Sequence, residues 1–408
     1  MEKMKNLDLN FQQFRLPIRI KLDNNYYTKL KQVLEKYCEY VDGIRDIDLD
    51  CKKRVKENCE EIKKCLQNYY NANIICAQEG ILNILKKYKA SRHIVNELNK
   101  NYAFRGIANS DLRVKKSDCE KLYQNMLEST FYYFKARLSE GDIKSEGMLH
   151  IPFNRRQITT TQRYSIAGVP CIYLTATSFG AWIEMGMPES DIFNVSAYKL
   201  PSNLKILNLC QFAGLIEGAS SMIQDIKELE RVKDFIEIFP LVIATSFSVA
   251  EQKRSFKSEY IVSQLVMQAA KSIGIDGVAY NSKKIDDIYA YPVAVNLALL
   301  MTDDVEKGDE YWKRATEVQL TEPKKYSSFL KEKYNPEVDL KKQECESYIN
   351  KIYCQGNSLN KPKIEICGNK FNYIESSFAK FDEYLVKQKF ENYRVTSTDQ
   401  HNGPESLK

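Results

Sequence analysis

The sequence has few residues of the kinds that support the commonest catalytic and metal chemistry. Histidine occurs three times in 408 residues, at His93, His150 and His401, so a histidine-based active site has few positions to use. The 11 cysteines include no Cys-x-x-Cys pair, and no metal site is predicted. No glycine pattern of the Walker or dinucleotide-binding kind occurs, which removes the usual support for ATP hydrolysis and for hydride transfer on a Rossmann fold.

Long apolar segments are also absent. The most apolar stretch, residues 239–250, is shorter than the roughly 18 uninterrupted apolar residues of a membrane-spanning helix, and it contains Thr245, Ser246 and Ser248. The first residues lack the apolar core of a signal peptide, and an odd number of cysteines in a long chain does not suggest a disulfide scaffold. We therefore expect a cytoplasmic protein without a membrane anchor.

The charge is nearly balanced and unevenly placed. The chain has 60 basic and 54 acidic side chains, which gives a net charge of +6. Residues 1–100 hold 20 basic and 14 acidic residues, and this difference of 20 − 14 = 6 accounts for the whole excess. An acidic partner, if the protein has one, is therefore expected at the N-terminal part.

Changes in sequence pattern predict three domains. Residues 1–98 have apolar residues at intervals of three and four, which predicts a small all-α domain. Residues 99–305 combine this helical pattern with short β-rich segments and predict an α/β domain. Residues 306–408 form a charged extension that ends in a disordered tail at 397–408. The expected strands are 102–106, 169–175, 195–200, 204–209 and 239–245, the expected helices 117–138, 216–235 and 259–273, and a hairpin is expected at 361–374.

The most informative segment is residues 161–184. A turn at Gly168 is followed by a strand over residues 169–175, and Thr177 or Ser178 can cap a helix that runs through Glu184. The apolar neighbours of Glu184 on this helix place its carboxylate near a core, where it needs a partner or a ligand.

This segment resembles the RES domain, a family of toxin and effector modules related in fold to ADP-ribosyltransferases. The family pattern has an arginine in a turn, a Gly-x-Pro before a strand, a tyrosine ten residues after the arginine and a glutamate eleven residues further on. Arg163, Gly168, Pro170, Tyr173 and Glu184 match it, with intervals 173 − 163 = 10 and 184 − 173 = 11. The resemblance implies an α+β fold with a mixed sheet and flanking helices, behind an all-α N-terminal domain.

Two flanking segments extend the resemblance. Phe104-Arg105-Gly106 matches the strand that opens many RES domains with an arginine, and residues 275–282 resemble the closing segment that carries the family's serine. Ser282 is the candidate for that serine, with Ser263 as a competing position. The sequence departs from the family where no glycine precedes Arg163 and where a long spacer separates Glu184 from Ser282.

The resemblance implies NAD as substrate, with cleavage of its nicotinamide–ribose bond and no cofactor. Glu184 would stabilise the ribosyl cation, and Arg105 and Arg163 would hold the pyrophosphate. Tyr173 would contact nicotinamide or ribose, and Ser282 would orient the sugar or the acceptor. The sequence leaves hydrolysis and phosphorolysis open.

The N-terminal part resembles the HEPN-type helical modules that are fused to RES domains. It lacks the Arg and His spacing of catalytic HEPN ribonucleases, because residues 86–89 before His93 are Lys-Lys-Tyr-Lys. We therefore expect a regulatory, sensing or oligomerising module, a homo-oligomer, and an antitoxin or sensor protein as partner.

The resulting hypothesis is an effector that depletes NAD to arrest growth or abort phage infection. The alternatives are a mono-ADP-ribosyltransferase that modifies a protein, and a catalytically dead nucleic-acid-binding or adaptor protein.

Overall fold

A mixed β-sheet organises the fold, which we describe from a computed structural model covering residues 7, 9–20, 26–105, 130–166, 168–221, 223, 226–249, 251, 253–302, 311–339, 346–355, 362–366 and 368–392. Within these residues ten strands form one sheet in the order β1-β5-β6-β7-β3-β2-β4-β8-β12, with β9 paired to β4. The strands are β1 (Val95–Glu97), β2 (Tyr133–Leu138), β3 (Cys171–Thr175), β4 (Phe193–Lys199), β5 (Lys205–Leu209), β6 (Gly277–Asn281), β7 (Val295–Leu300), β8 (Gln319–Thr321), β9 (Lys324–Lys325) and β12 (Phe390–Asn392). The pair β5 and β6 is parallel, and the other pairs are antiparallel.

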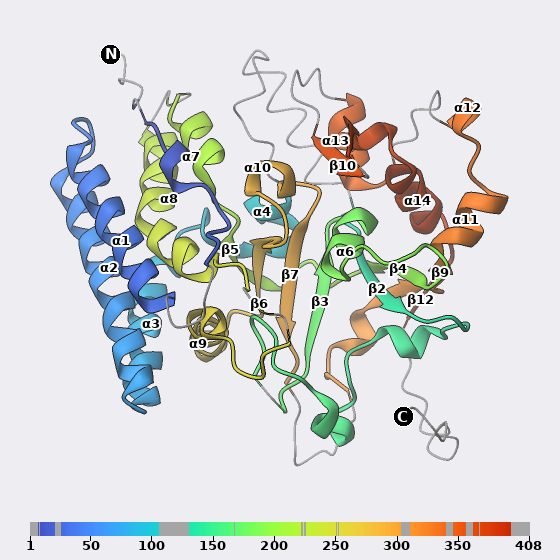
Figure 1. The fold of residues 1–408 in the computed structure, drawn as a ribbon, viewed down its shortest axis with the longest axis horizontal. Helices are drawn as coiled ribbons and strands as arrows, with labels where there is room; N and C mark the ends of the chain where they lie inside the picture. Colours follow the sequence, from blue (N-terminus) through green and yellow to red (C-terminus); the bar gives the residue numbers. More distant parts are fainter. Residues whose placement is uncertain are drawn as a thin grey trace.

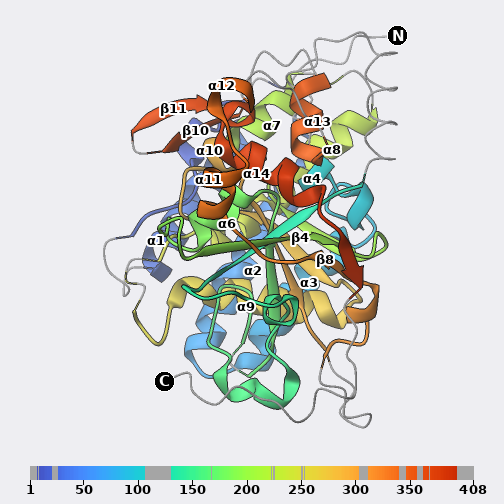
Figure 2. The same ribbon diagram turned by 90° about the vertical axis from the view of Figure 1, so that its right-hand side faces the viewer.

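Helices cover both faces of this sheet, which confirms the predicted α+β class. In Figure 1 the N-terminal helices lie on the left of the sheet with α8 and α9, and the C-terminal helices lie on the right with α6. Figure 2 shows the C-terminal helices nearest the viewer. The helices are α1 (Tyr26–Gly43), α2 (Leu49–Tyr70), α3 (Ile74–Tyr88), α4 (Tyr102–Arg105), α6 (Ser178–Glu184), α7 (Ala213–Ser220), α8 (Ile226–Thr245), α9 (Ile261–Ser272), α10 (Asp287–Ala290), α11 (Tyr326–Glu332), α12 (Pro336–Asp339), α13 (Tyr348–Gln355) and α14 (Ser377–Val386).

Two hydrophobic cores lie on opposite faces of the sheet. Val278 and Tyr280 of β6 belong to the core that contains α1, α2, α3, α8 and α9, whereas Ala279 between them belongs to the core that contains α6, α11 and α14. This division follows from the alternation of side chains along a strand. Central strands therefore supply apolar residues to both cores.

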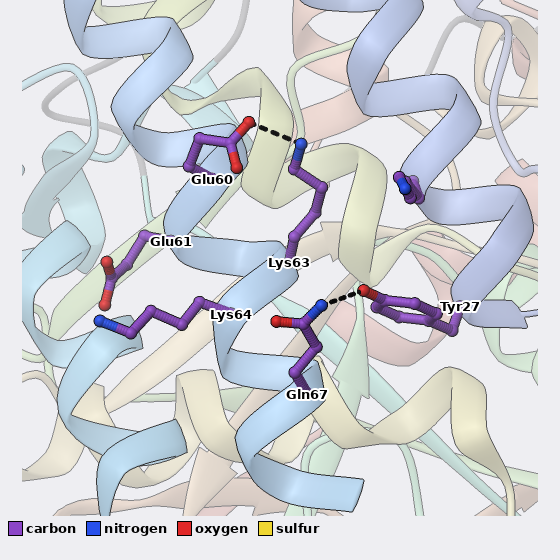
Figure 3. Close-up of a pocket in the computed structure, with 7 residues that line it drawn as sticks. Tyr27, Glu60, Glu61, Lys63, Lys64 and Gln67 are labelled. Atoms are coloured by element: carbon purple, nitrogen blue, oxygen red, sulfur yellow. Dashed lines mark hydrogen bonds and ion pairs between the residues drawn. The ribbon is translucent and has the colours of Figure 1, made fainter.

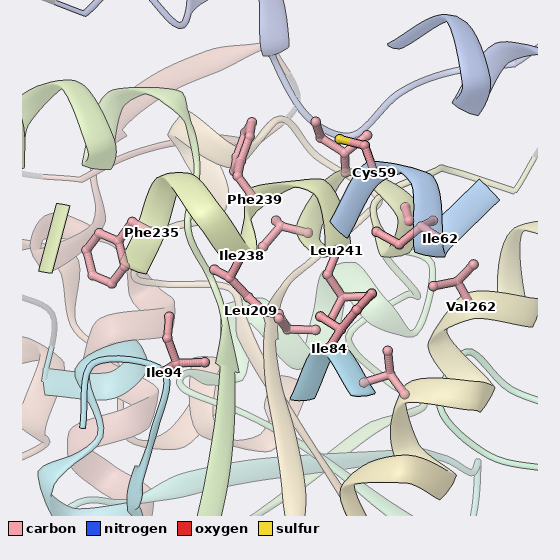
Figure 4. Packing of buried hydrophobic residues seen from close by; sticks show 14 of the residues in the cluster. Cys59, Ile62, Ile84, Ile94, Leu209, Phe235, Ile238, Phe239, Leu241 and Val262 are labelled. Carbon is pink, nitrogen blue, oxygen red and sulfur yellow. The ribbon is translucent and has the colours of Figure 1, made fainter. Parts of the chain in front are cut away.

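The helix α8 joins the N-terminal helices to the sheet. Its side chains Phe235, Ile238 and Leu241 pack among residues of α2, α3 and β5, as Figure 4 shows. Pro240 lies inside this helix and has no N–H to donate to the carbonyl of Ile236 four residues earlier. The hydroxyl of Tyr37 from α1 donates to that carbonyl at 2.7 Å, so the packing of α1 satisfies a group that the proline leaves open.

Three predicted elements were of the wrong type in the residues that the structure describes. Residues 102–105 form the helix α4 and not a strand, and residues 133–138 form the strand β2 where a helix was expected over 117–138. Residues 239–245 belong to α8 and not to a strand. The sequence did not indicate this helix, because a segment that is buried on all sides shows no helical period. The expected hairpin is present as β10 (Lys363–Ile366) and β11 (Asn369–Asn372).

The cores cross the sequence positions that suggested domain boundaries. The first core joins α1, α2 and α3 to α8 and α9, and strand β1 pairs with β5. From the C-terminal part, β8 and β12 join the sheet and α14 packs against α6. The division at residues 98 and 305 stays a prediction, and the tail at 397–408 lies outside the described residues. None of the helices in the described part of the chain is long and apolar enough to cross a membrane.

Candidate functional site

A cavity of about 830 Å³ lies across the middle of the sheet and collects three of the predicted site residues. Arg163, Tyr173 and Glu184 all line it. Strands β2, β3, β6 and β7 contribute to its walls, and the end of α6 and the connection between α8 and α9 complete them. Its volume falls in the range of about 300–1,000 Å³ that is typical of small-molecule sites.

The strand β3 and the helix α6 bring Tyr173 and Glu184 to this cavity. Gly168 has φ +80°, a conformation that favours glycine, and the chain then enters β3. After β3, Thr177, one of the two predicted candidates, caps α6 by accepting a hydrogen bond from the Gly180 N–H to its Oγ1 at 3.0 Å. Glu184 is the last residue of α6, so the strand, the cap and the length of the helix together set its position.

Glu184 is half-buried and has a fixed partner. Its Oε1 accepts a hydrogen bond of 2.7 Å from the side-chain amide of Asn296 on β7. Its backbone carbonyl accepts a hydrogen bond of 2.6 Å from the Nζ of Lys284. The carboxylate is therefore held over β7, and the end of the helix is held by the segment that follows β6.

Arg163 is buried and engaged with the backbone of another segment. Its Nη1 donates to the carbonyl of Thr245 at 3.0 Å, and its Nη2 donates to the carbonyl of Phe247 at 2.8 Å. The guanidinium carbon lies 5.0 Å from the ring centre of Tyr260. Arg163 therefore joins both ends of the connection between α8 and α9, and these bonds use two of its five N–H groups.

Tyr173, Tyr260 and Tyr280 are tyrosines among the described residues that line the cavity. The hydroxyl of Tyr173 donates to Ser165 Oγ at 3.2 Å and accepts from the backbone N–H of Tyr164 at 3.1 Å, which ties β3 to the turn that carries Arg163. Burial raises the pKa of Tyr173 and of Tyr280, and the charge of Glu184 raises the pKa of Tyr280 further. These phenols stay protonated and present aromatic surface to a ligand.

Two cations on β2 are among the lining residues that sequence reasoning missed. Lys135 Nζ and Arg137 Nη2 both donate to the carbonyl of Leu149, at 2.7 and 3.2 Å. Burial, and then the neighbouring Arg137, lower the pKa of Lys135 well below its usual value. The alternation of Lys135 and Arg137 in an otherwise apolar strand was the available signal, but the segment was interpreted as a helix.

Most of the charged side chains among the described lining residues of the cavity are basic. Glu184 is the one carboxylate among its described lining residues. Six cationic side chains line it, namely Arg19, Lys135, Arg137, Arg163, Lys283 and Lys284. Lys283 is buried and pairs with Asp287 at 3.6 Å, and burial lowers its pKa. A site with this balance attracts an anionic ligand.

The remaining predicted residues are placed differently. Ser282 is buried next to the cavity-lining Lys283, and its Oγ accepts the N–H of Lys284 at 3.3 Å. Ser263 is buried in α9, and neither serine is among the described residues that line the cavity. Arg105 ends the helix α4 and is not on a strand, and its side chain lies outside the described part of the chain.

His150 also lines the cavity, and its ring is held as a neutral imidazole. Its Nε2 accepts the backbone N–H of Trp312 at 3.1 Å, so the proton is on Nδ1, which lies 2.8 Å from the carbonyl of Ile151. Burial lowers the pKa of His150 to about 4. With both nitrogens engaged, His150 is a structural group of the cavity wall and not a proton carrier near neutral pH.

A second hollow lies on the surface between α1 and α2, with a volume of about 380 Å³. Figure 3 shows that its polar groups bond to one another: Lys63 contacts Glu60 at 2.6 Å, and Gln67 donates to the hydroxyl of Tyr27 at 2.7 Å. It contains none of the predicted site residues. The cavity on the sheet is therefore the better candidate for a functional site.

Comparison with known proteins gives one informative similarity. The chain is 29% identical over 215 residues to a protein of Bacillus subtilis (strain 168) that carries the name "Putative toxin YopC". The similarity covers 50% of this chain and 48% of that protein, so the match spans about half of each. No protein-family profile matches the chain, and no solved structure matches it.

Proposed function

We propose that this protein is a toxin that cleaves the bond between nicotinamide and ribose in NAD. The observation that carries the proposal is the setting of Glu184, a carboxylate fixed by Asn296 in a cavity whose other charged lining residues are cations. Such a cavity suits a substrate with an anionic part and a part that becomes positively charged during the reaction.

NAD has both parts. Its pyrophosphate carries negative charge, which arginine and lysine side chains bind through charge-assisted hydrogen bonds. In this site Lys135 and Arg137 are the candidates for that role. Arg163 can contribute the N–H groups that do not bond to the carbonyls of Thr245 and Phe247. The half-buried ring of Tyr173 and the buried ring of Tyr280 offer surfaces for nicotinamide.

The reaction needs no cofactor. The bond from C1 of the ribose to the nicotinamide nitrogen breaks, and its electron pair returns to the ring and neutralises the positive charge there. The ribose is left as an oxocarbenium cation, which Glu184 stabilises by its charge and orients through a ribose hydroxyl. A water oxygen then adds to C1 and loses a proton, or a phosphate oxygen adds instead.

The name of the similar protein supports the biological part of the proposal. That protein carries the name "Putative toxin YopC", and loss of NAD stops every reaction that depends on it. We therefore propose that the protein arrests growth, or aborts a phage infection, by depleting NAD.

Purified protein incubated with NAD tests this function. We expect free nicotinamide and ADP-ribose in equal amounts, or an ADP-ribose phosphate ester if phosphate is the acceptor, so the assay is run with and without phosphate. NAD labelled in the adenosine part separates a third outcome, because label on protein would indicate an ADP-ribosyltransferase. NAD that stays intact at high protein concentration would contradict the proposal.

A further inference from the structure

The C-terminal helix α14 makes a buried polar contact with the start of α6, more than 200 residues away in sequence. The Oδ1 of Asp382 accepts the backbone N–H of Ser178, the first residue of α6, at 2.9 Å. The hydroxyl of Tyr373 donates to Oδ2 of the same carboxylate. Asp382 therefore satisfies one of the N–H groups that a helix leaves open at its first turn.

Apolar contacts extend this junction along α6. Phe179 lies 5.6 Å from Phe378 of α14, and Trp182 lies 5.3 Å from the same ring, measured between ring centres. The indole N–H of Trp182 donates to the carbonyl of Pro188 at 2.9 Å. The face of α6 that leads toward Glu184 therefore rests on α14.

The helix is short enough to transmit a shift. Glu184 lies six positions after Ser178, which corresponds to about 9 Å at the rise of an α-helix. Asn296 holds the Glu184 side chain at the other end through a single hydrogen bond of 2.7 Å. A displacement at the first residue of α6 therefore changes the position of the carboxylate relative to β7.

We propose that Asp382 is a positioning residue that sets the place of Glu184 by fixing the first turn of α6. This inference rests on the proposed function for its effect on turnover, but the contact between Asp382 and α6 can be measured without it. It also gives the C-terminal part of the chain a role in the site.

The surroundings of Asp382 make this contact sensitive to pH. The carboxyl group is fully buried, and burial raises its pKa to about 7, while the bonds from Ser178 and Tyr373 favour the charged form. The titratable groups that face it are Tyr373, Glu383 on its own helix and Tyr326 on α11. Its proton occupancy therefore changes near neutral pH, and the ionised form accepts both hydrogen bonds.

Steady-state kinetics of Asp382→Ala and Asp382→Asn test the role in turnover. Alanine leaves the Ser178 N–H without its acceptor, so we expect kcat to fall at least about tenfold while KM changes less than about twofold. Asparagine keeps an acceptor but cannot titrate, so a rise of kcat through pH 7 is expected for the native protein and not for this variant. Glu391→Gln removes an exposed carboxylate on β12 and is the matched control.

Fluorescence of Trp182 gives a readout that does not depend on NAD. The chain has two tryptophans, so Trp312→Phe leaves Trp182 on α6 as the single reporter. We expect its emission to titrate with a midpoint near pH 7, and we expect Asp382→Asn to abolish the titration. A titration that persists in Asp382→Asn, or an unchanged kcat in folded Asp382→Ala, would overturn the inference. Intact NAD with the native protein would reject the proposed function, and the fluorescence result would still decide the link between Asp382 and α6.

Discussion

The side-chain amide of Asn296 donates a hydrogen bond of 2.7 Å to Oε1 of Glu184, across the gap between the strand β7 and the end of α6. Asn296 is buried, and it pairs with Thr175 of β3 and with Tyr280 of β6 in the sheet. The rigid centre of the sheet therefore fixes the orientation of the carboxylate. A preorganised carboxylate stabilises a developing cation without first having to reorient.

Asn296→Ala tests this orientation. The variant leaves Glu184 charged but free to rotate, so we expect kcat to fall about tenfold, which corresponds to about 1.4 kcal/mol of transition-state stabilisation. KM is expected to change little, because the anionic part of the substrate binds elsewhere. Steady-state kinetics of nicotinamide release measure both constants. A native kcat in this variant would mean that the bond has no part in catalysis.

Lys135→Met is expected to weaken substrate binding and to stabilise the fold. The lysine is half-buried beside Arg137, and the two cations share one carbonyl acceptor. Because the folded-state pKa of Lys135 is depressed, the native protein binds this proton less tightly than the unfolded chain does, so the lysine lowers stability increasingly as pH falls below its usual pKa. We expect KM to rise about tenfold or more and the melting temperature to stay the same or to rise.

The matched control for Lys135→Met is Lys205→Gln, which removes an exposed lysine at the start of β5. It should change neither KM nor the melting temperature. A lowered melting temperature together with a native KM for Lys135→Met would show that Lys135 supports the fold and not the substrate.

Arg163→Lys should destabilise the protein. Lysine cannot reach two carbonyl groups with a planar fork, so at least one of the buried carbonyls of Thr245 and Phe247 loses its partner. We expect a loss of about 1–3 kcal/mol in the free energy of unfolding, measured by urea titration. Lost turnover with native stability would instead assign Arg163 to substrate binding alone.

The stability of the protein should respond to pH through Asp382. Its folded-state pKa is raised to about 7 from the ordinary value of 3.8, so the native state binds this proton more tightly than the unfolded state does. The group therefore lowers stability progressively as pH rises from about 4 to about 7, by at most about 1.4 kcal/mol per pH unit. Asp382→Asn should remove this dependence of the free energy of unfolding on pH. If urea titrations give the same dependence for the native protein and for the variant, the assignment is contradicted.

The sequence predicted the local part of the site and missed the parts that depend on tertiary contacts. Strand β3, the Thr177 cap and the helix to Glu184 lie within a short segment, so their residue pattern was sufficient. The sequence alone does not place Arg137 in the site, because its strand lies beside β3 and β4 only in space, and without that context the segment also fits the end of a helix.

Contacts between distant segments explain the other differences. Buried residues in α8 are surrounded by α1, α2 and the sheet, so the apolar run at residues 239–245 showed neither a helical nor a strand period. The bond from Ser178 to Asp382 joins residues 204 positions apart, and nothing in either local sequence indicates it. Such contacts are set by the packing of whole elements.

Release of nicotinamide from NAD by the native protein and by Glu184→Gln tests the central claim most directly. Glutamine keeps the size of the side chain but removes the negative charge that stabilises the ribosyl cation, so turnover should fall by about a hundredfold or more. Glu189→Gln, which changes an exposed glutamate shortly after α6, should keep native turnover. Equal rates for the native protein and Glu184→Gln, or no nicotinamide from either, would contradict the account.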